Sequence, residues 1–220
     1  RKADLIISNS KSGKKDLSKL CKTRVVNIHS PSFEFINNKK KKKITKVFKL
    51  IAVGRLVKEK GYKTIIKALY NLKIKNFNMQ ILGDGPEKKN LNNLISALHL
   101  EKKIKLIGFK KNTTKYYDKS NLFINASLFE GFPNAVVEAI NHNIPVICSN
   151  CKGGMNEILL SGKGGDMFPV NDFRELSKKI TLFFKNSAKL NKKLTIARRN
   201  IKKYSISAHV KKYEKVFYEI

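Results

Sequence analysis

The sequence predicts an α/β domain built on a parallel sheet whose strands alternate with helices. Apolar segments of strand length lie near 48–54, 78–82, 104–107, 122–125 and 145–148, with a weaker one near 165–168. Segments of helical periodicity separate them, near 61–72, 87–99, 132–142, 153–161 and 172–185. Strands separated by helices of about 10–15 residues are typical of right-handed βαβ units. We therefore expect one parallel sheet flanked by helices.

The flanks of this alternating region are predicted to belong to other parts of the molecule. Strand, helix and strand are expected near 4–8, 13–20 and 24–28, and helices near 189–203 and 206–219. Because the chain begins with Arg1 and is already strand-like at Asp4, we expect an N-terminal part to be missing. The predicted organisation is the tail of an N-terminal domain in 1–30, a linker in 31–46, the main domain in 47–188 and C-terminal helices in 189–220.

The chain is strongly basic, with 47 Lys and Arg against 16 Asp and Glu and a formal charge of +31. Such an excess suggests a nucleic acid or an anionic membrane as partner. The excess is almost entirely Lys in a Lys-, Asn- and Ile-rich chain, whereas Arg is the residue that binds phosphate bidentately. We interpret it as a compositional bias and expect no nucleic-acid partner. The lysine run at 39–43 could contact anionic lipid, although a solvated loop is the simpler interpretation.

Cysteine usage and hydropathy limit the compartment and the metal chemistry. No apolar run of about 18 residues is present, and three cysteines are too few for a disulfide framework. We therefore expect a cytoplasmic protein, either soluble or peripheral at the inner face of the membrane. Cys148 and Cys151 form a CxxC pair with no second pair or nearby His, so we assign them packing or loop roles and expect no metal site.

The predicted strands end in residues suited to ligand binding, and in open parallel sheets ligands bind beyond the carboxyl ends of the strands. The first main strand leads into Gly54, Arg55 and, shortly after, Lys60, and two cations beside a loop suit a diphosphate. The next strand ends in the tight turn Gly83-Asp84-Gly85-Pro86, and Gly108-Phe109 follows the third.

A further strand end carries the stretch from Ser127 to Ala139, which includes Glu130-Gly131-Phe132-Pro133-Asn134 and Glu138. Pro133 fits the first turn of a helix. The free amides at such a helix start form an anion site. A diphosphate or another phosphate-bearing anion is therefore the ligand class that this edge of the sheet favours.

These motifs, in this order, resemble the family 4 retaining glycosyltransferases of GT-B fold, which have two Rossmann-like domains. The resemblance rests on Gly-Arg-Leu followed by Lys-Gly, on Gly-Asp-Gly-Pro, and on two Glu separated by seven residues within a Glu-Gly-Phe-Pro-Asn context. It is strong over residues 47–185. It implies that the chain is the C-terminal, donor-binding half of a GT-B enzyme with a remnant of the N-terminal domain.

The resemblance also implies roles for the matched residues. Arg55 and Lys60 would grip the donor diphosphate and neutralise the leaving nucleotide, and Glu130 would hold the donor sugar near its anomeric carbon. Glu138 would accept hydrogen bonds from the ribose. Other donor contacts are expected from backbone groups of Gly54, Gly83, Gly85, Gly108, Phe109, Lys110, Gly131, Phe132 and Asn134.

The implied reaction moves a sugar from a nucleotide sugar to a glycan or lipid-linked acceptor with retention of configuration and without a metal or other cofactor. A UDP-sugar is the expected donor, and the segment 149–158 is similar to a loop of members that use UDP-N-acetylhexosamines, although Lys152 and Met155 depart from the usual Pro. The acceptor pocket comes from the N-terminal half in this family, so this chain alone would transfer poorly. The last helix, near 206–219, resembles the one that crosses back to that half.

Three other functions remain open at this level. An epimerase or phosphorylase of the same fold would lack the paired glutamates in this context, so Glu130 argues against the epimerase, and product analysis with a UDP-sugar alone would decide. A basic module that binds nucleic acid or membrane would show a steep dependence of affinity on salt. A nicotinamide dehydrogenase is disfavoured because no GxGxxG follows the first complete strand.

Overall fold

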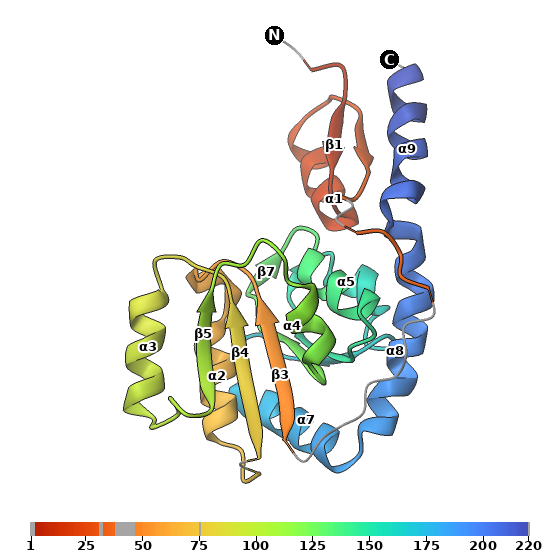
Figure 1. The fold of residues 1–220 in the computed structure, drawn as a ribbon. Coiled ribbons are helices and arrows are strands. Elements are labelled where there is room, and N and C mark those ends of the chain that lie inside the picture. The colour runs from red at the N-terminus through yellow and green to blue at the C-terminus, as the bar shows by residue number, and fades with distance from the viewer. Residues whose placement is uncertain (1–2, 31–32, 38–46, 75, 220) are drawn as a thin grey trace.

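The computed structural model describes residues 3–30, 33–37, 47–74 and 76–219 and confirms the parallel sheet flanked by helices. Six strands lie in the order β10-β8-β6-β3-β4-β5, and every neighbouring pair is parallel (Figure 1). Their bounds are β3 Phe48–Val53, β4 Phe77–Leu82, β5 Ile104–Gly108, β6 Leu122–Asn125, β8 Val146–Ser149 and β10 Asp166–Phe168. Because all are parallel, their carboxyl ends meet at one edge of the sheet.

Helices cover both faces of the sheet, since alternate side chains of a strand point to opposite faces. Leu50 and Ala52 of β3 pack into a core with α2, α3 and α7, whereas Ile51 packs into a second core with α5, α6 and α8. Cys148 and Cys151 are free and buried in that second core, which confirms their packing role. The helices of the two layers are α2 Tyr62–Tyr70, α3 Lys88–Ala97, α4 Thr114–Lys119, α5 Asn134–Asn141, α6 Met155–Leu159, α7 Phe173–Lys185 and α8 Ser187–Ile201.

Three local features differ from the sequence prediction. Helix α4 was not expected, because it is polar and only Tyr117 within it is buried. Helix α6 ends four residues after it begins, because Leu160 takes a left-handed conformation with φ of 50°. Two short strands, β7 Phe129–Glu130 and β9 Lys152–Gly153, pair with each other outside the main sheet. All three features lie near the carboxyl edge or on the helical layer beside it.

A small unit at the start of the chain lies beyond the carboxyl edge of the sheet (Figure 1). It consists of β1 Ile6–Ser8, α1 Lys11–Leu20 and β2 Val25–Asn27, and the two strands are parallel. Helix α9, Ile206–Tyr218, follows the short helix η2, Lys202–Tyr204, and runs beside this unit. An ion pair of 2.7 Å joins Arg24 to Glu219 at the end of α9. We refer to residues 3–30 as the N-terminal unit.

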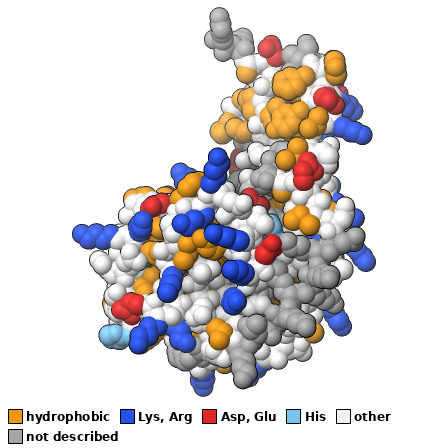
Figure 2. All heavy atoms as spheres, viewed as in Figure 1, with side chains coloured by type: hydrophobic (Ala, Val, Ile, Leu, Met, Phe, Trp, Pro, Cys, Tyr) orange, Lys and Arg blue, Asp and Glu red, His pale blue; other side chains and the backbone are white. Residues whose placement is uncertain are grey.

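The predicted division into domains stays a prediction, and the lysine run at 39–43 lies outside the described residues, as does most of the predicted linker. On the face shown in Figure 2, Lys and Arg are scattered among neutral side chains of the sheet domain, while hydrophobic side chains gather over the N-terminal unit and α9. Leu20 and Phe217 are among the exposed hydrophobic residues. Within the described residues, no helix combines the length and the hydropathy that a membrane span requires.

Two glycines at the carboxyl edge give a direct test of close backbone packing. Both have positive φ, but a Cβ on Gly83 would overlap the Gly54 carbonyl, whereas a Cβ on Gly108 would meet nothing within 4 Å. We expect Gly108→Ala to lower the free energy of unfolding by about 1–2 kcal/mol, the cost of the left-handed backbone alone. Gly83→Ala should cost about 2 kcal/mol more, because backbone must move. Urea unfolding checks this, and equal losses would contradict it.

Candidate functional site

The residues predicted to bind a ligand lie together at the carboxyl edge, facing the N-terminal unit. Gly54 and Arg55 follow β3, Gly83 and Gly85 follow β4, and Lys60 ends the 3-10 helix η1, Lys58–Lys60. The edge is continuous, since the Gly54 amide donates to Leu82 (2.9 Å) and the Gly83 amide to Gly108 (3.0 Å). Parallel strands thus bring segments far apart in sequence to one place.

Glu130 is the most strongly held side chain of this edge. Its Oε1 accepts hydrogen bonds from Lys60 Nζ at 2.6 Å, from Ser127 Oγ at 2.6 Å and from Asn125 Nδ2 at 3.3 Å. The carboxylate is 9% exposed and the Lys60 side chain 25%, so this ion pair is shielded from water far more than a surface pair. Among the described residues all three donors reach Oε1, which leaves Oε2 for a ligand hydroxyl.

The backbone around Glu130 is fixed by the pairing of β7 with β9. A Cβ on Gly153, whose φ is +116°, would overlap the Glu130 carbonyl, so this approach requires glycine. The next amide, of Gly154, donates to the Gly131 carbonyl at 3.0 Å. The Gly153-Gly154 segment therefore sets the position of the loop that carries Glu130.

The two cations predicted to bind a diphosphate have different surroundings. Lys60 is held by Glu130, whereas Arg55 is exposed and pairs with no carboxylate in the part of the chain that the structure describes. Between them, the Tyr62 hydroxyl donates to the Gly54 carbonyl at 2.9 Å. Burial, with a smaller effect from Glu130, raises the pKa of Tyr62 well above its ordinary value, so the hydroxyl stays a neutral donor. Arg55 is thus the cation that a ligand can reach without displacing a partner.

Glu138 lies in a different environment, on the second turn of α5. Its Oε2 accepts a hydrogen bond of 3.0 Å from the Tyr117 hydroxyl, which comes from α4. Burial raises the pKa of Glu138, and the Tyr117 bond only partly opposes this effect. The two glutamates of one motif therefore differ, since Glu130 is paired with a cation and Glu138 is paired with a neutral hydroxyl.

The start of α5 departs from the expected anion site. The Asn134 amide, expected to be free for a ligand, donates to the Phe132 carbonyl at 2.9 Å, because Pro133 precedes the helix and closes a tight turn. Instead, Asn134 Oδ1 is buried and lacks a partner among the described residues. The Phe132 side chain turns inward onto His29, with ring centroids 4.9 Å apart. The amide of Asn134 is thus occupied in this structure.

The two remaining glycine turns, at Gly85 and at Gly108, also use some of their backbone groups in hydrogen bonds within the protein. The Gly85 amide donates to Asp84 Oδ1 at 2.8 Å, and Lys88 pairs with the same carboxylate at 3.1 Å, which favours a structural role for this turn. Gly108 uses its carbonyl to accept from Gly83. Phe109 beyond it is 74% exposed, and Lys110 is exposed as well, so both side chains are accessible.

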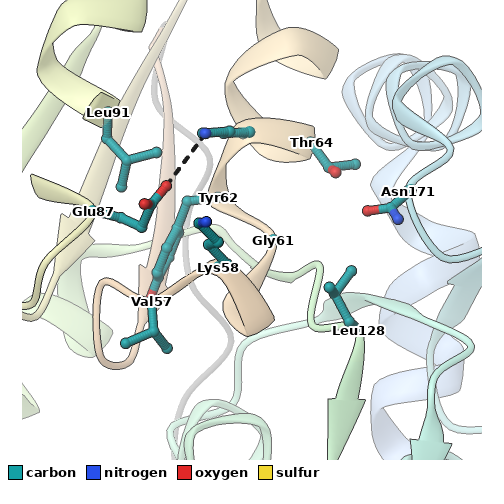
Figure 3. A pocket seen from close by; sticks show the side chains of 10 residues that line it. Val57, Lys58, Gly61, Tyr62, Thr64, Glu87, Leu91, Leu128 and Asn171 are labelled. Carbon is teal, nitrogen blue, oxygen red and sulfur yellow. Dashed lines mark ion pairs between the residues drawn. The ribbon is translucent and has the colours of Figure 1, made fainter.

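A cleft of 240 Å³ is lined by residues that flank Lys60 in the sequence, among them Lys58 and Gly61 (Figure 3). Lys63 and Glu87 form an ion pair of 3.3 Å at its side. Its lining includes Tyr62 and Gly61 but none of the residues predicted to bind a ligand. The candidate site is therefore the open edge and not this cleft.

Four residues that hold the site were missed from the sequence: Tyr62, Tyr117, Asn125 and Ser127. Asn125 and Ser127 lie just before Glu130 in the same motif, so their proximity was a usable signal. Tyr117 lies in the unpredicted helix α4, and no sequence pattern connects it to Glu138, which is 21 residues away.

Comparison with known proteins gives a consistent match over most of the chain. The sequence pattern of the family described as glycosyl transferases group 1 matches residues 34–204. The chain is 39% identical over 135 residues to an uncharacterized glycosyltransferase of Methanocaldococcus jannaschii, which covers 60% of this chain and 30% of that protein. It is 33% identical over 209 residues to the N-acetylgalactosamine-N,N'-diacetylbacillosaminyl-diphospho-undecaprenol 4-alpha-N-acetylgalactosaminyltransferase of Campylobacter jejuni, covering 87% of this chain and 56% of that enzyme.

Solved structures share the fold. The Anabaena protein HepE, in complex with UDP and glucose, superposes with a TM-score of 0.88 at 20% identity, covering 99% of this chain and 64% of that one. The pneumococcal O-GlcNAc transferase GtfA, in complex with UDP and GlcNAc, gives a TM-score of 0.83 at 22% identity, covering 99% and 45%. The chain therefore spans about a third to two thirds of the length of these relatives.

Burial of Glu138 gives a prediction for stability. The pKa of Glu138 in the folded protein lies above the ordinary value of 4.5. Just above pH 4.5 the folded state therefore binds more protons than the unfolded chain. Ionisation of Glu138 thus lowers the free energy of unfolding as the pH rises. We expect Glu138→Gln to raise the Tm at pH 7.5, because it removes the buried charge. Each kcal/mol gained in the free energy of unfolding should raise the Tm by about 2–4 °C. At pH 4 the difference should vanish. Exposed Glu101→Gln is the control, and a lower Tm of Glu138→Gln at pH 7.5 would refute the assignment.

Proposed function

The chain belongs to the group 1 glycosyl transferases, and from that membership we propose that its carboxyl edge binds a nucleotide-sugar donor and supports transfer of the sugar with retention of configuration. The observation that carries the proposal is the shielded pair of Lys60 with Glu130 at 2.6 Å, together with Arg55, which has no carboxylate partner among the described residues. A carboxylate with one free oxygen suits sugar hydroxyls, and an adjacent cation suits phosphate. In a nucleotide sugar the phosphate is bonded to the anomeric carbon of the sugar, so the hydroxyls and the phosphate lie close together in one molecule.

Each side chain has a distinct role in this proposal. Arg55 binds the diphosphate first, since it has no partner to lose among the described residues. Lys60 stabilises the charge that develops on the leaving nucleotide, while Glu130 keeps the ammonium in place and binds the sugar through Oε2. Glu138 accepts from the ribose, an interaction that is the same in the ground and transition states. The two glutamates therefore contribute to different steps.

UDP is the proposed nucleotide, and a metal ion is not required. The support for UDP is the fold shared with HepE and GtfA, both of which bind UDP in their solved structures. Arg55 and Lys60 supply the positive charge that a divalent ion would otherwise bring to a diphosphate. An N-acetylhexosamine is the proposed sugar, in line with the Campylobacter jejuni relative, whose name specifies an N-acetylgalactosaminyltransferase.

The proposed acceptor is a lipid-linked or free glycan, as the diphospho-undecaprenol in the name of that relative indicates for that enzyme. A lipid-linked acceptor would require the enzyme to work at the cytoplasmic face of a membrane. The excess of lysine is compatible with peripheral contact to anionic lipid there. The acceptor side of the site would face the N-terminal unit.

Donor binding is tested by thermal shift in the presence of EDTA. A ligand at a hundredfold excess over its Kd stabilises by about 2.7 kcal/mol, which corresponds to a rise in Tm of about 5–10 °C for a chain of this size. We expect UDP to produce this rise without metal, Arg55→Ala to remove most of it, and the exposed Arg199→Ala on α8 to leave it unchanged. An unchanged Tm with UDP-, GDP- and ADP-sugars alike would reject the proposal.

The two glutamates are separated by steady-state kinetics of the full-length enzyme with varied donor. Glu130→Gln should lower kcat about 10²-fold, because it removes an interaction with charge that develops in the transition state. Glu138→Gln should raise KM about tenfold and leave kcat nearly unchanged, since it removes uniform binding. The reverse pattern would exchange the roles, and conversion of UDP-sugar to an epimer without acceptor would favour an epimerase.

A further inference from the structure

Two carboxylates connect the N-terminal unit with the sheet domain: Asp16 of α1 forms an exposed ion pair of 3.7 Å with Lys152 of β9, and the shielded contact is made by Glu157 of α6. Its Oε1 accepts the backbone N–H of Lys11, the first residue of α1, at 2.8 Å. Its Oε2 lies 2.9 Å from Nε2 of His29, just beyond β2. The Glu157 side chain is 12% exposed and that of His29 is 7% exposed, so the contact is shielded from water. One side chain therefore joins two elements of the N-terminal unit to α6.

The segment that carries Glu157 is the same segment that positions Glu130. Gly153 pairs with Glu130 through β9 and β7, and the Gly154 amide donates to the Gly131 carbonyl at 3.0 Å. Helix α6 begins at the next residue, Met155. Glu157 is thus one helical turn from the backbone that fixes the Glu130 loop, and a shift of α6 would be passed on to that loop.

The N-terminal unit also touches the Glu130 loop directly. A Cβ on Gly131 would lie 3.1 Å from Asn9 Nδ2, which places the Asn9 carboxamide against the loop. Phe132 packs its ring on His29, the partner of Glu157, and on Tyr204 at 5.3 Å. The loop is therefore enclosed between β9 on one side and the residues held by Glu157 on the other.

The charge of Glu157 is maintained in this buried setting. Burial by itself would raise the pKa of Glu157, but the hydrogen bonds from His29 and from the Lys11 amide outweigh it and hold the pKa below its ordinary value. Loss of either partner would leave one oxygen of a shielded carboxylate without its hydrogen bond, and this is costly.

On the premise of the proposed function, we propose that Glu157 is a positioning residue for transfer: it fixes the start of α1 and the end of β2 against α6 and thereby holds the Glu130 loop in its working geometry. Glu157 acts through its neighbours and touches no reacting atom. Without it the donor still binds to Arg55 and Lys60, but the two sides of the site are no longer held together. Water then competes with the acceptor for the activated sugar.

A purely structural tether is the alternative, and the chain offers a matched control for it. Arg24 and Glu219 form a second ion pair, 2.7 Å long, that joins the same N-terminal unit to α9. This pair has no contact with β7, β9 or α6 among the described interactions. Breaking it should loosen the unit without moving the Glu130 loop.

The experiment compares Glu157→Ala, Glu157→Gln and Glu219→Gln in the full-length enzyme. We expect Glu157→Ala to lower kcat at least tenfold, to leave the Kd for UDP within twofold, and to raise severalfold the share of donor that is hydrolysed instead of transferred. Glu157→Gln keeps an acceptor for the Lys11 amide and should recover most of kcat. Glu219→Gln should lower the Tm but change neither kcat nor the hydrolysed share. Unchanged kcat in Glu157→Ala, or equal effects in Glu157→Ala and Glu219→Gln, would overturn the proposal.

Hydrogen–deuterium exchange separates this inference from the proposed function, because it does not depend on turnover. Exchange in the peptide covering 129–134 should accelerate at least fivefold in Glu157→Ala and stay unchanged in Glu219→Gln. If wild-type enzyme transfers sugar but exchange in 129–134 is the same in all variants, the positioning role is wrong. If wild-type enzyme transfers no sugar while exchange responds as expected, the proposed function fails and the mechanical link stands.

Discussion

The architecture of the site depends on keeping a buried carboxylate, Glu130, paired in place. An ionised group removed from water costs several kcal/mol unless its charge and its lone pairs are met by partners. Those partners come from separate segments, with Lys60 from the loop after β3 and Ser127 and Asn125 from the end of β6. The β6 end, the β3 loop and the β7–β9 pair must therefore keep their relative positions for the charge to remain compensated. The ion pair of Lys60 with Glu130 thus links the parallel sheet to the geometry of its carboxyl edge.

The two glutamates of the motif have different properties because their surroundings differ. Glu130 lies among donors and a cation, so its charge is held ready and one oxygen stays available. Glu138 lies against a neutral tyrosine in a less polar setting, where burial raises its pKa and ionisation works against folding. A neutral residue at this position would avoid that cost. The two carboxylates of one motif therefore differ in their partners and in the effect of burial.

The N-terminal unit lies beyond the carboxyl edge of the sheet, and α9 runs beside it (Figure 1). Their contacts with the sheet domain include the shielded hydrogen bonds of Glu157, the rings of His29, Phe132 and Tyr204, and an exposed ion pair between Asp16 and Lys152. This junction combines polar and aromatic contacts. The Glu130 loop lies at this junction, so its geometry is sensitive to how the two units meet.

The sequence by itself determined the alternation of strands and helices, and hence the parallel sheet and the edge at which Arg55, Lys60 and Glu130 would lie, because hydrophobic periodicity and strand ends are local properties. Even the weak strand near 165–168 was confirmed as β10. Only the tertiary structure decided which groups are already hydrogen-bonded. The Asn134 amide donates to the Phe132 carbonyl, and Tyr117 of the unpredicted helix α4 donates to Glu138. Glu157 accepts from the amide of Lys11, 146 residues earlier in the chain. Such pairings depend on distances between segments that share no sequence pattern, and burial and hydrogen bonding are set only when those segments are packed together.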